Sequence, residues 1–175
     1  AAQSVQLWVD PGQAMAFSGA PDRPTKSARA HLLALALAVL MIRGGERVGL
    51  TTADCPPRPG KAQLMRLAQA LAEAQAAPED HAAPISHTLA SRARVLLMSD
   101  FLNDPAPIEA AVAEAAGRGV SGVLLQILDP VEESFPFDGR TLFRSVSGAV
   151  SHETREAGDL RARYLDRLAE RRDRL

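Results

Sequence analysis

The sequence is poor in the residues that mark several specialised classes of protein. Its 175 residues include one cysteine, Cys55, which excludes an internal disulfide framework and suits a reducing compartment. The four histidines show neither a helical metal pair nor a companion cysteine cluster. Aromatic residues make up only 4%, which leaves Leu, Val and Ala to build the core. We therefore expect a domain that is held together by apolar packing alone.

Neither sign of charge dominates, and no apolar run is long. The 20 basic side chains balance 21 acidic ones, so the chain lacks the basic footprint of a nucleic-acid binder. The run "HLLALALAVLMI", closed by Arg43, is about half of the ~20 residues that span a bilayer, and it predicts a core helix. The opening "AAQSVQLWVD" has no signal-peptide pattern. These features predict a cytoplasmic protein without a transmembrane segment.

Short β-rich runs alternate with longer Ala/Leu-rich stretches, which is typical of a mostly parallel sheet with helices on both faces. The pattern predicts strands over 5–9, 47–52, 94–99 and 120–128. It predicts helices over 26–43, 62–76, 108–117 and 156–174, and a short helical turn over 85–91. The breaker-rich "CPPRPGK" and "AAPEDHAAP" are predicted to be loops. The last helix carries one narrow apolar stripe, which packs on the sheet or meets a partner.

Aspartates follow each predicted strand, in "WVD", "LTTAD", "LLMSD" and "LQILD": Asp10, Asp54, Asp100 and Asp129. The carboxyl ends of parallel strands share one edge of a sheet, and a doubly wound order would bring Asp10 beside Asp100 at the topological switch. Two such carboxylates could hold a hard cation. The simpler alternative is that each aspartate caps a loop or the next helix.

One glycine-rich segment and one aromatic segment complete the pattern. "GRGVSG" matches the dinucleotide fingerprint, but it follows a predicted helix and leads into a strand, the reverse of what a phosphate site needs. No nucleotide cofactor is expected. "DPVEESFPFDGRTLFRS" predicts a loop that returns as a short edge strand, with Phe135 and Phe137 packed as anchors.

Five segments together resemble a known bacterial family: "VDPGQAMAFSG", "TKSARAHLLALALAVLMIRGGERVGL", "RPGKAQLMRLAQAL", "VLLMSDFLND" and "LQILDPVEESFPFDGRTLFRS". They are similar to the von Willebrand A-like domains catalogued as domain of unknown function 58, often encoded beside MoxR-type AAA ATPases. The resemblance implies one domain over 1–175, with a three-layer, doubly wound, Rossmann-like α/β fold. It also implies that the chain is the C-terminal part of a longer protein with a preceding β-rich segment.

The family's metal-ion-dependent adhesion site reads Asp-x-Ser-x-Ser, completed by a distant Thr and Asp. By position, Asp10 matches the first acid and Asp100 resembles the later one, and Thr88 is the nearby threonine. The serine positions hold Gly12 and Ala14, which have no side-chain oxygen. Because Mg²⁺ asks for six oxygens in near-octahedral array, we expect Mg²⁺ or Mn²⁺ to bind weakly or not at all, and no other cofactor.

These features predict a non-enzymatic protein-interaction domain that works with a MoxR-type AAA ATPase or its client in chaperone-like assembly or maturation. The partner surface is expected on the loops around 10–18, 100–104 and 129–138. Its predicted residues are Asp10, Gly12, Ala14, Asp100 and Asp129. The alternative is a metal-dependent hydrolase in which Asp10, Asp100 and Asp129 hold Mg²⁺ or Mn²⁺ to activate water.

Overall fold

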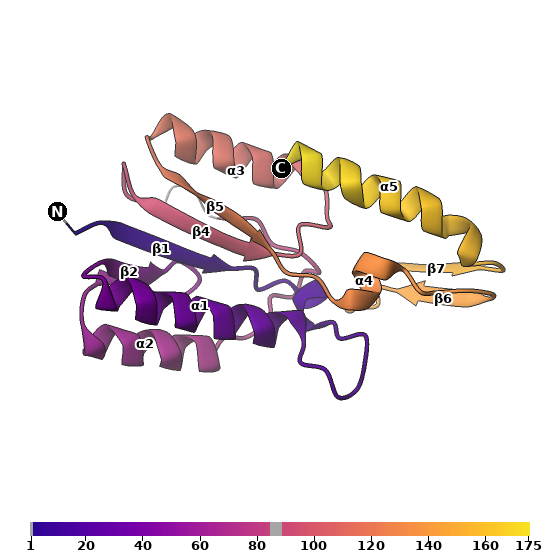
Figure 1. The fold of residues 1–175 in the computed structure, drawn as a ribbon, viewed down its shortest axis with the longest axis horizontal. Helices are drawn as coiled ribbons and strands as arrows, with labels where there is room; N and C mark the ends of the chain where they lie inside the picture. Colours follow the sequence, from indigo (N-terminus) through magenta and orange to yellow (C-terminus); the bar gives the residue numbers. More distant parts are fainter. Residues whose placement is uncertain (1, 85–88) are drawn as a thin grey trace.

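The computed structural model describes residues 2–84 and 89–175 of a mixed α/β fold (Figure 1). Its strands are β1 Ser4–Val9, β2 Arg47–Leu50, β3 Cys55–Arg58, β4 Arg94–Ser99, β5 Ser121–Gln126, β6 Thr141–Arg144 and β7 Ser151–Thr154. Its helices are the 3₁₀ turn η1 Gln13–Ala16, α1 Lys26–Arg43, α2 Lys61–Ala72, α3 Ala106–Gly117, α4 Pro130–Ser134 and α5 Gly158–Arg174. Most of the turn predicted over 85–91 lies outside the described residues, as does Thr88.

The main sheet has five strands in the order β3-β2-β1-β4-β5. β1 pairs in parallel with β2 and β4, β4 pairs in parallel with β5, and only β3 runs antiparallel. The predicted pairing of β1 with β4 is confirmed, with a register that runs from Val5 opposite Arg94 to Val9 opposite Met98. This register brings the two carboxyl ends together, so that Asp10 and Asp100 follow neighbouring strands.

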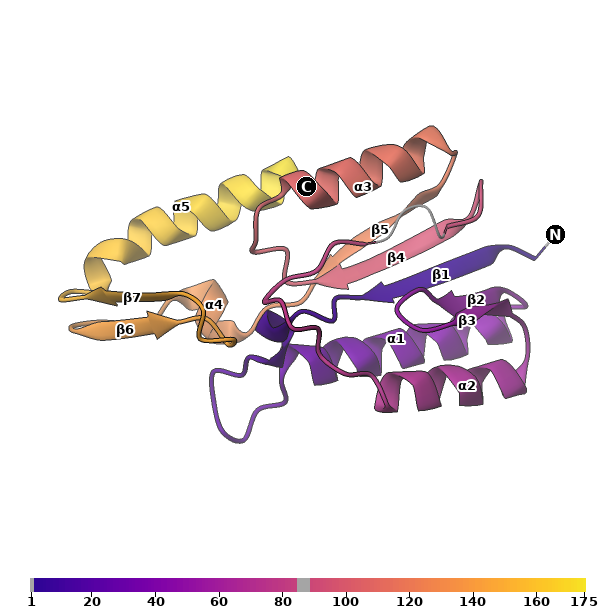
Figure 2. The ribbon, with the colours of Figure 1, turned by 180° about the vertical axis from the view of Figure 1, so that it is seen from behind.

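Different helices cover the two faces of this sheet (Figures 1 and 2). Leu7 of β1 belongs to the core beneath α1 and α2, with Ala34 and Leu67. Its neighbour Trp8 belongs to a second cluster, which includes Ile108 of α3. Successive strand residues point to opposite faces, so both faces of β1 are buried. The expected mostly parallel sheet flanked by helices is confirmed.

Several predicted boundaries agree with the structure, and one loop does not. The helix over 26–43 is confirmed: the Thr25 hydroxyl caps it by accepting from the N–H of Ala28 at 3.1 Å. The segment predicted as a loop at "CPPRPGK" contains β3, and that part of the prediction is wrong. Its prolines are tolerated because β3 is an edge strand, where the outer row of N–H groups needs no partner.

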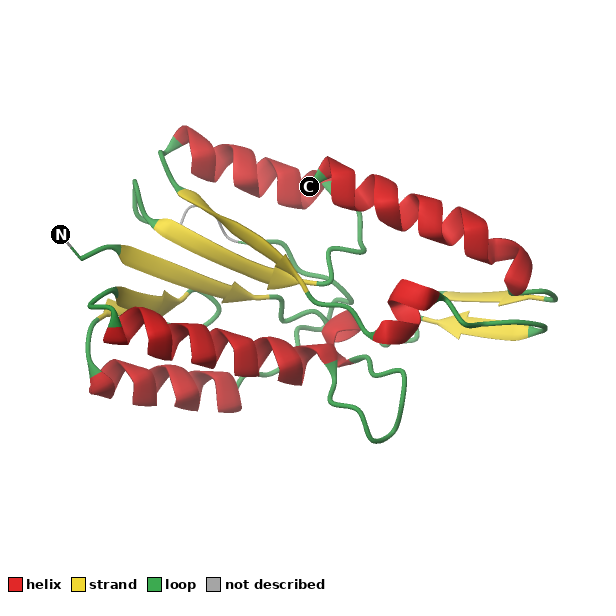
Figure 3. Cartoon of the chain, in the orientation of Figure 1, coloured by secondary structure: helices red, strands yellow, loops and turns green. Residues whose placement is uncertain are grey.

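The C-terminal segments form an arm beyond the carboxyl edge of the sheet (Figures 1 and 3). The short strand predicted after the loop is β6, and among the described residues it pairs only with β7, in an antiparallel hairpin separate from the main sheet. Phe135 is buried, as predicted, and its ring lies 4.6 Å from Tyr164 and 5.6 Å from Phe143. Phe137 is half-buried and meets Phe135 edge-on at 5.1 Å. These rings give the hairpin a small core of its own, which is why it does not need the main sheet.

Among the described helices, none combines the length and the apolarity that crossing a bilayer would require.

Candidate functional site

The carboxyl ends of β1 and β4 bring Asp10 and Asp100 together, as predicted. Asp10 is 2% exposed, and its Oδ2 accepts from the Ser99 hydroxyl at 2.6 Å. Its Oδ1 accepts from the N–H groups of Gly12 at 2.8 Å and Ala82 at 3.3 Å. Burial raises the pKa of Asp10, and the nearby Asp100 adds to this, although the three hydrogen bonds oppose it. The Asp10 carboxylate is therefore held by internal donors on both oxygens.

Asp100 is part of a buried charge cluster. Its Oδ2 accepts from Lys26 Nζ at 2.7 Å, and its Oδ1 accepts from the N–H of Leu102 at 3.0 Å. Lys26 Nζ also donates to Glu132 Oε1 at 2.6 Å. Burial raises the pKa of Glu132, against the opposing charge of Lys26. One ammonium from α1 thus lies between a carboxylate that follows β4 and another from α4.

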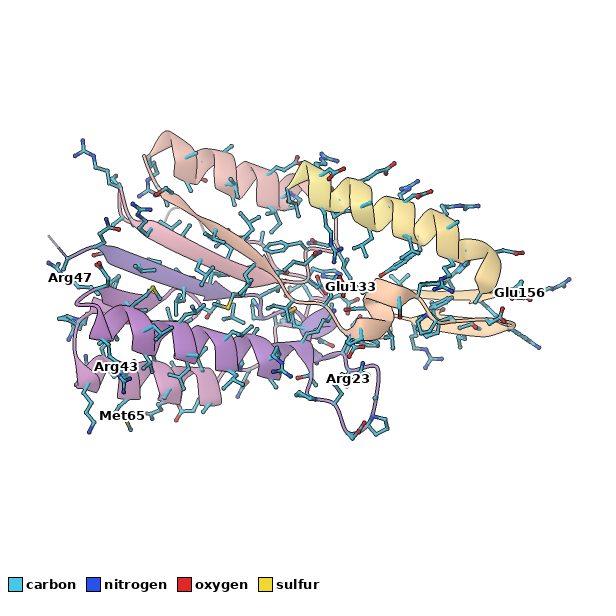
Figure 4. All side chains as sticks on the ribbon, in the orientation of Figure 1. Arg23, Arg43, Arg47, Met65, Glu133 and Glu156 are labelled. Carbon is cyan, nitrogen blue, oxygen red and sulfur yellow. The ribbon has the colours of Figure 1, made fainter. Side chains whose placement is uncertain are left out.

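Asp129 serves mainly as a helix cap. Its side chain accepts from the N–H groups of Val131 at 2.9 Å and Gly19 at 3.0 Å, and from Arg23 Nη1 at 2.6 Å. Arg23 extends from the loop before α1 (Figure 4). Burial alone would raise the pKa of Asp129, but these donors outweigh it and the pKa is lowered. Asp129 therefore fastens that loop to the start of α4.

The three buried aspartates share one local arrangement. Each side chain accepts a hydrogen bond from the N–H group two residues further on, in Gly12, Leu102 and Val131 respectively. This is the capping role that the sequence left open as the simpler alternative. Each carboxylate also reaches another element: Asp10 meets Ser99, Asp100 meets Lys26, and Asp129 meets Gly19. The fourth acid, Asp54, is exposed in the turn before β3.

A loop covers the turn that follows β1. The N–H of Ala77 donates to Pro11 O at 2.7 Å, and the N–H of Ala14 donates to Asp80 O at 2.8 Å. This loop leaves no space for a side chain at Gly12, because an added Cβ would lie 2.4 Å from Asp80 O and 2.7 Å from His81 Cα. The glycine is needed for this close backbone approach.

Asp10, His81 and Asp100 each offer a ligand atom, and these atoms lie within 4.8 Å of one another. The residues nevertheless do not fit the metal site that the family resemblance implies. Gly12 and Ala14 supply no side-chain oxygen, and both carboxylates already accept hydrogen bonds from the protein. An ammonium also lies 2.7 Å from Asp100 Oδ2, where it would repel a divalent ion.

A cavity of about 310 Å³ opens beside Gly12, between β1, α1 and α2, which is at the small end of ligand pockets. Its lining is mostly apolar and includes Trp8, Pro11, His31, Thr51, Leu71 and Ala82. Burial lowers the pKa of His31. The cavity adjoins the acidic edge, but none of the carboxylates in the described part of the chain lines it.

Of the predicted partner residues, Asp10, Gly12, Asp100 and Asp129 are buried and Ala14 is partly buried. Lys26, His81, Ser99 and Glu132 complete the site and were missed. Ser99 could have been found from the "SD" pair that ends β4. Glu132 could also have been found, because Asp129 and Glu132 have the spacing of a capping box. Nothing in the sequence pattern marks Lys26, because it looks like a charged residue of a solvated helix face.

The fold and the site define an α/β domain with a mostly parallel sheet and buried charges at its carboxyl edge. The chain belongs to the family described as "Protein of unknown function DUF58", which matches residues 1–174. Among solved structures it is similar to an aerotolerance-related membrane protein from Bacteroides fragilis NCTC 9343 carrying multiple mutations to serines, with a TM-score of 0.50. That likeness has 15% identity, covers 98% of this chain and 88% of the other, and shows the fold alone. No curated protein matches the chain.

Proposed function

We propose that this chain is a non-enzymatic, cytoplasmic protein-interaction domain of the von Willebrand A-like, doubly wound three-layer type, with a degenerate metal-ion-dependent adhesion site. The observation that carries the proposal is the engagement of Asp10 and Asp100 by donors of the protein itself. A general base needs a lone pair within reach of its substrate, and a metal ligand needs one for its ion. Here the oxygens of both carboxylates instead accept hydrogen bonds from the protein, and these bonds hold the loops in place.

The surface proposed for a partner is made by the loops that these acids organise, together with the adjoining hairpin. Ser147, in the hairpin turn, donates to both carboxylate oxygens of Asp80, at 3.0 and 2.8 Å. The turn is thereby fastened to the loop that covers Gly12. Val146 and Val150, next to this contact, are exposed. Exposed apolar side chains beside a rigid polar frame are typical of interaction surfaces.

The partner that we propose is a MoxR-type AAA ATPase, or its client, in chaperone-like assembly or maturation. Membership of the family supports this choice, because the family resemblance implies an association with such ATPases. The nearly even balance of acidic and basic side chains favours a protein over a nucleic acid.

The test measures binding of the purified chain to the MoxR-type ATPase of the same genome by biolayer interferometry, with ATP and with ADP. Val150→Asp should weaken binding at least tenfold, because a charge would enter the apolar contact. Leu40→Asp is a matched control: Leu40 is 64% exposed and Val150 is 65% exposed. Leu40 lies three residues before Arg43, the last residue of α1, at the end of that helix far from the β6–β7 hairpin, and Figure 4 labels Arg43 there. Equal affinities for both variants and the wild type would reject this surface.

The cluster of Asp10, His81 and Asp100 favours a second candidate, a metal-dependent hydrolase. In that case Asp129 would be a structural cap and not a third ligand. A screen of phosphatase and esterase substrates with added Mg²⁺ or Mn²⁺ separates the two functions. Turnover that is abolished by Asp100→Ala would reject the interaction-only proposal.

A further inference from the structure

The chain has only two lysines among its 20 basic side chains, and each is the first residue of a helix: Lys26 in α1 and Lys61 in α2. A positive charge is unfavourable there, because unpaired N–H groups give a helix N-terminus a partial positive charge. Lys61 is exposed, so water screens its charge. The Lys26 side chain is 2% exposed and must be compensated by the protein.

That compensation comes from three separate parts of the chain. Lys26 Nζ donates to Asp100 Oδ2 at 2.7 Å and to Glu132 Oε1 at 2.6 Å. It also lies 5.5 Å from the centroid of the Phe17 ring, within range of a cation–π contact. A buried ammonium is tolerated only when it is paired and hydrogen-bonded, as it is here.

We propose that Lys26 Nζ is the resident cation of this edge, in place of the divalent ion that the family resemblance implies. The ammonium neutralises Asp100, joins α1 to α4, and repels any metal that approaches the cluster of Asp10, His81 and Asp100. This inference rests on the proposed function and deepens it: the loops of the edge are set without a metal, so partner binding is independent of Mg²⁺ and Mn²⁺.

The structure also indicates which substitution would create a metal site. Returning a serine to position 12 would fail, because the loop backbone occupies the space of its side chain. Removing the Lys26 ammonium instead vacates a point within 2.7 Å of Asp100 Oδ2 and 2.6 Å of Glu132 Oε1. Two carboxylates with room for water between them offer hard oxygen ligands. Lys26→Ala should therefore convert an ammonium site into a divalent-cation site.

The first experiment needs no variant. The wild type is treated with an amine-reactive ester, and labelling of each lysine is followed by mass spectrometry over time. Lys61 should react at least tenfold faster than Lys26 in the native protein, and the two rates should converge in urea. Equal native rates would overturn the proposal, because they would show that Lys26 is not held between the two acids.

The second experiment compares melting temperatures with EDTA and with 10 mM Mg²⁺ or Mn²⁺. We expect no shift for the wild type or for the matched control Lys61→Ala. Lys26→Ala should melt roughly 10 °C lower in EDTA, because it leaves buried carboxylates unpaired. Mn²⁺ should restore roughly 5 °C or more if it exceeds its Kd a hundredfold. If Lys26→Ala is folded and neither Mg²⁺ nor Mn²⁺ changes its melting temperature, the proposal is overturned.

If Lys26→Ala folds only with Mn²⁺ present, the proposal is supported. If it does not fold at all, Lys26→Gln decides, since its amide can still donate to the acids but carries no charge to repel an ion. Metal stabilisation of that variant supports the proposal, and its absence overturns it. Micromolar Mn²⁺ binding by the wild type, measured by calorimetry, would also overturn the proposal. It would leave the interaction role standing, because that role is tested by partner binding.

Discussion

The two ends of helix α1 are buried in different ways. Towards its middle and end, the small side chains of Ala30, Ala34 and Ala38 pack against the sheet in a purely apolar core. At its first residue, Lys26 is as deeply buried but is surrounded by carboxylates. Apolar burial depends on area and tolerates exchange of similar side chains, whereas a buried charge depends on each of its partners. The apolar end of α1 should therefore tolerate substitution better than the charged end.

The largest expected effect follows from removing one partner at the charged end. Asp100→Ala leaves Lys26 with Glu132 as its remaining carboxylate and deprives the N–H of Leu102 of its acceptor. Breaking a buried ion pair from one side costs about 3–5 kcal/mol. Urea unfolding should show this loss, while Asp54→Ala, at an exposed acid, should stay within about 0.5 kcal/mol of the wild type. Similar free energies of unfolding for the two variants would show that the buried charges at the start of α1 do not depend strongly on one another.

The apolar core in which α1 packs is tested by Leu67→Ala in the neighbouring helix α2, because the Leu67 side chain is fully buried in that core. The cavity should lower the free energy of unfolding by about 2–4 kcal/mol. Met65→Ala, two residues earlier on the exposed face of α2, is the control (Figure 4). Leu67→Met should recover most of the loss, because it restores the volume. At position 100 we expect that no apolar side chain of similar volume recovers the stability that Asp100→Ala loses. Recovery by such a side chain would contradict the expected difference between apolar and charged burial.

A smaller loss of stability is expected from a substitution at Gly12, where the turn after β1 packs against the loop that contains Asp80 and His81. The added methyl group of Gly12→Ala would overlap Asp80 O, so the loop must move, at a cost of about 1–3 kcal/mol. Gly117→Ala, at the end of α3, has open space around its added methyl group and should be neutral or slightly stabilising. Thermal unfolding of both variants compares them directly. If Gly12→Ala unfolds at the same temperature as Gly117→Ala, the loop can move away from the added methyl group without a measurable loss of stability.

The smallest effect is a pH dependence from His31, beside the cavity. Burial lowers the pKa of His31 below its ordinary value of 6.5, so the unfolded chain binds the proton more readily than the folded one. The stability linked to His31 is therefore complete above pH 6.5 and is lost as the pH falls below it. Urea unfolding from pH 7.5 to 5 should show a steeper decline for the wild type than for His31→Gln. Parallel curves would contradict this assignment.

The fold was largely predictable because it rests on local patterns. The continuous apolar runs at 5–9 and 94–99 indicated inner strands of a parallel sheet, and they are neighbours. Thr25 and Gly44 marked the two ends of α1. The short strand predicted within "RTLFRSV" is β6, but its partner β7 was not predicted, because alternation indicates a strand and does not say which strand it pairs with. The aromatic cluster around Phe135, which brings β6 and α5 together, also could not be predicted, because its members lie apart in the sequence.

At the carboxyl edge, the sequence by itself determined one of the two roles of each aspartate, which is to cap a nearby backbone N–H group. Asp10, Asp100 and Asp129 each cap the N–H two residues ahead, an arrangement that needs only neighbouring residues. The second role, which is to bind a distant part of the chain, depends on the whole fold. Lys26 donates to Asp100, which lies 74 residues away, and Arg23 donates to Asp129, which lies 106 residues away. Only the tertiary structure decides whether a lysine at a helix start faces water or two carboxylates, because burial follows from how the elements pack and not from the helix to which the residue belongs.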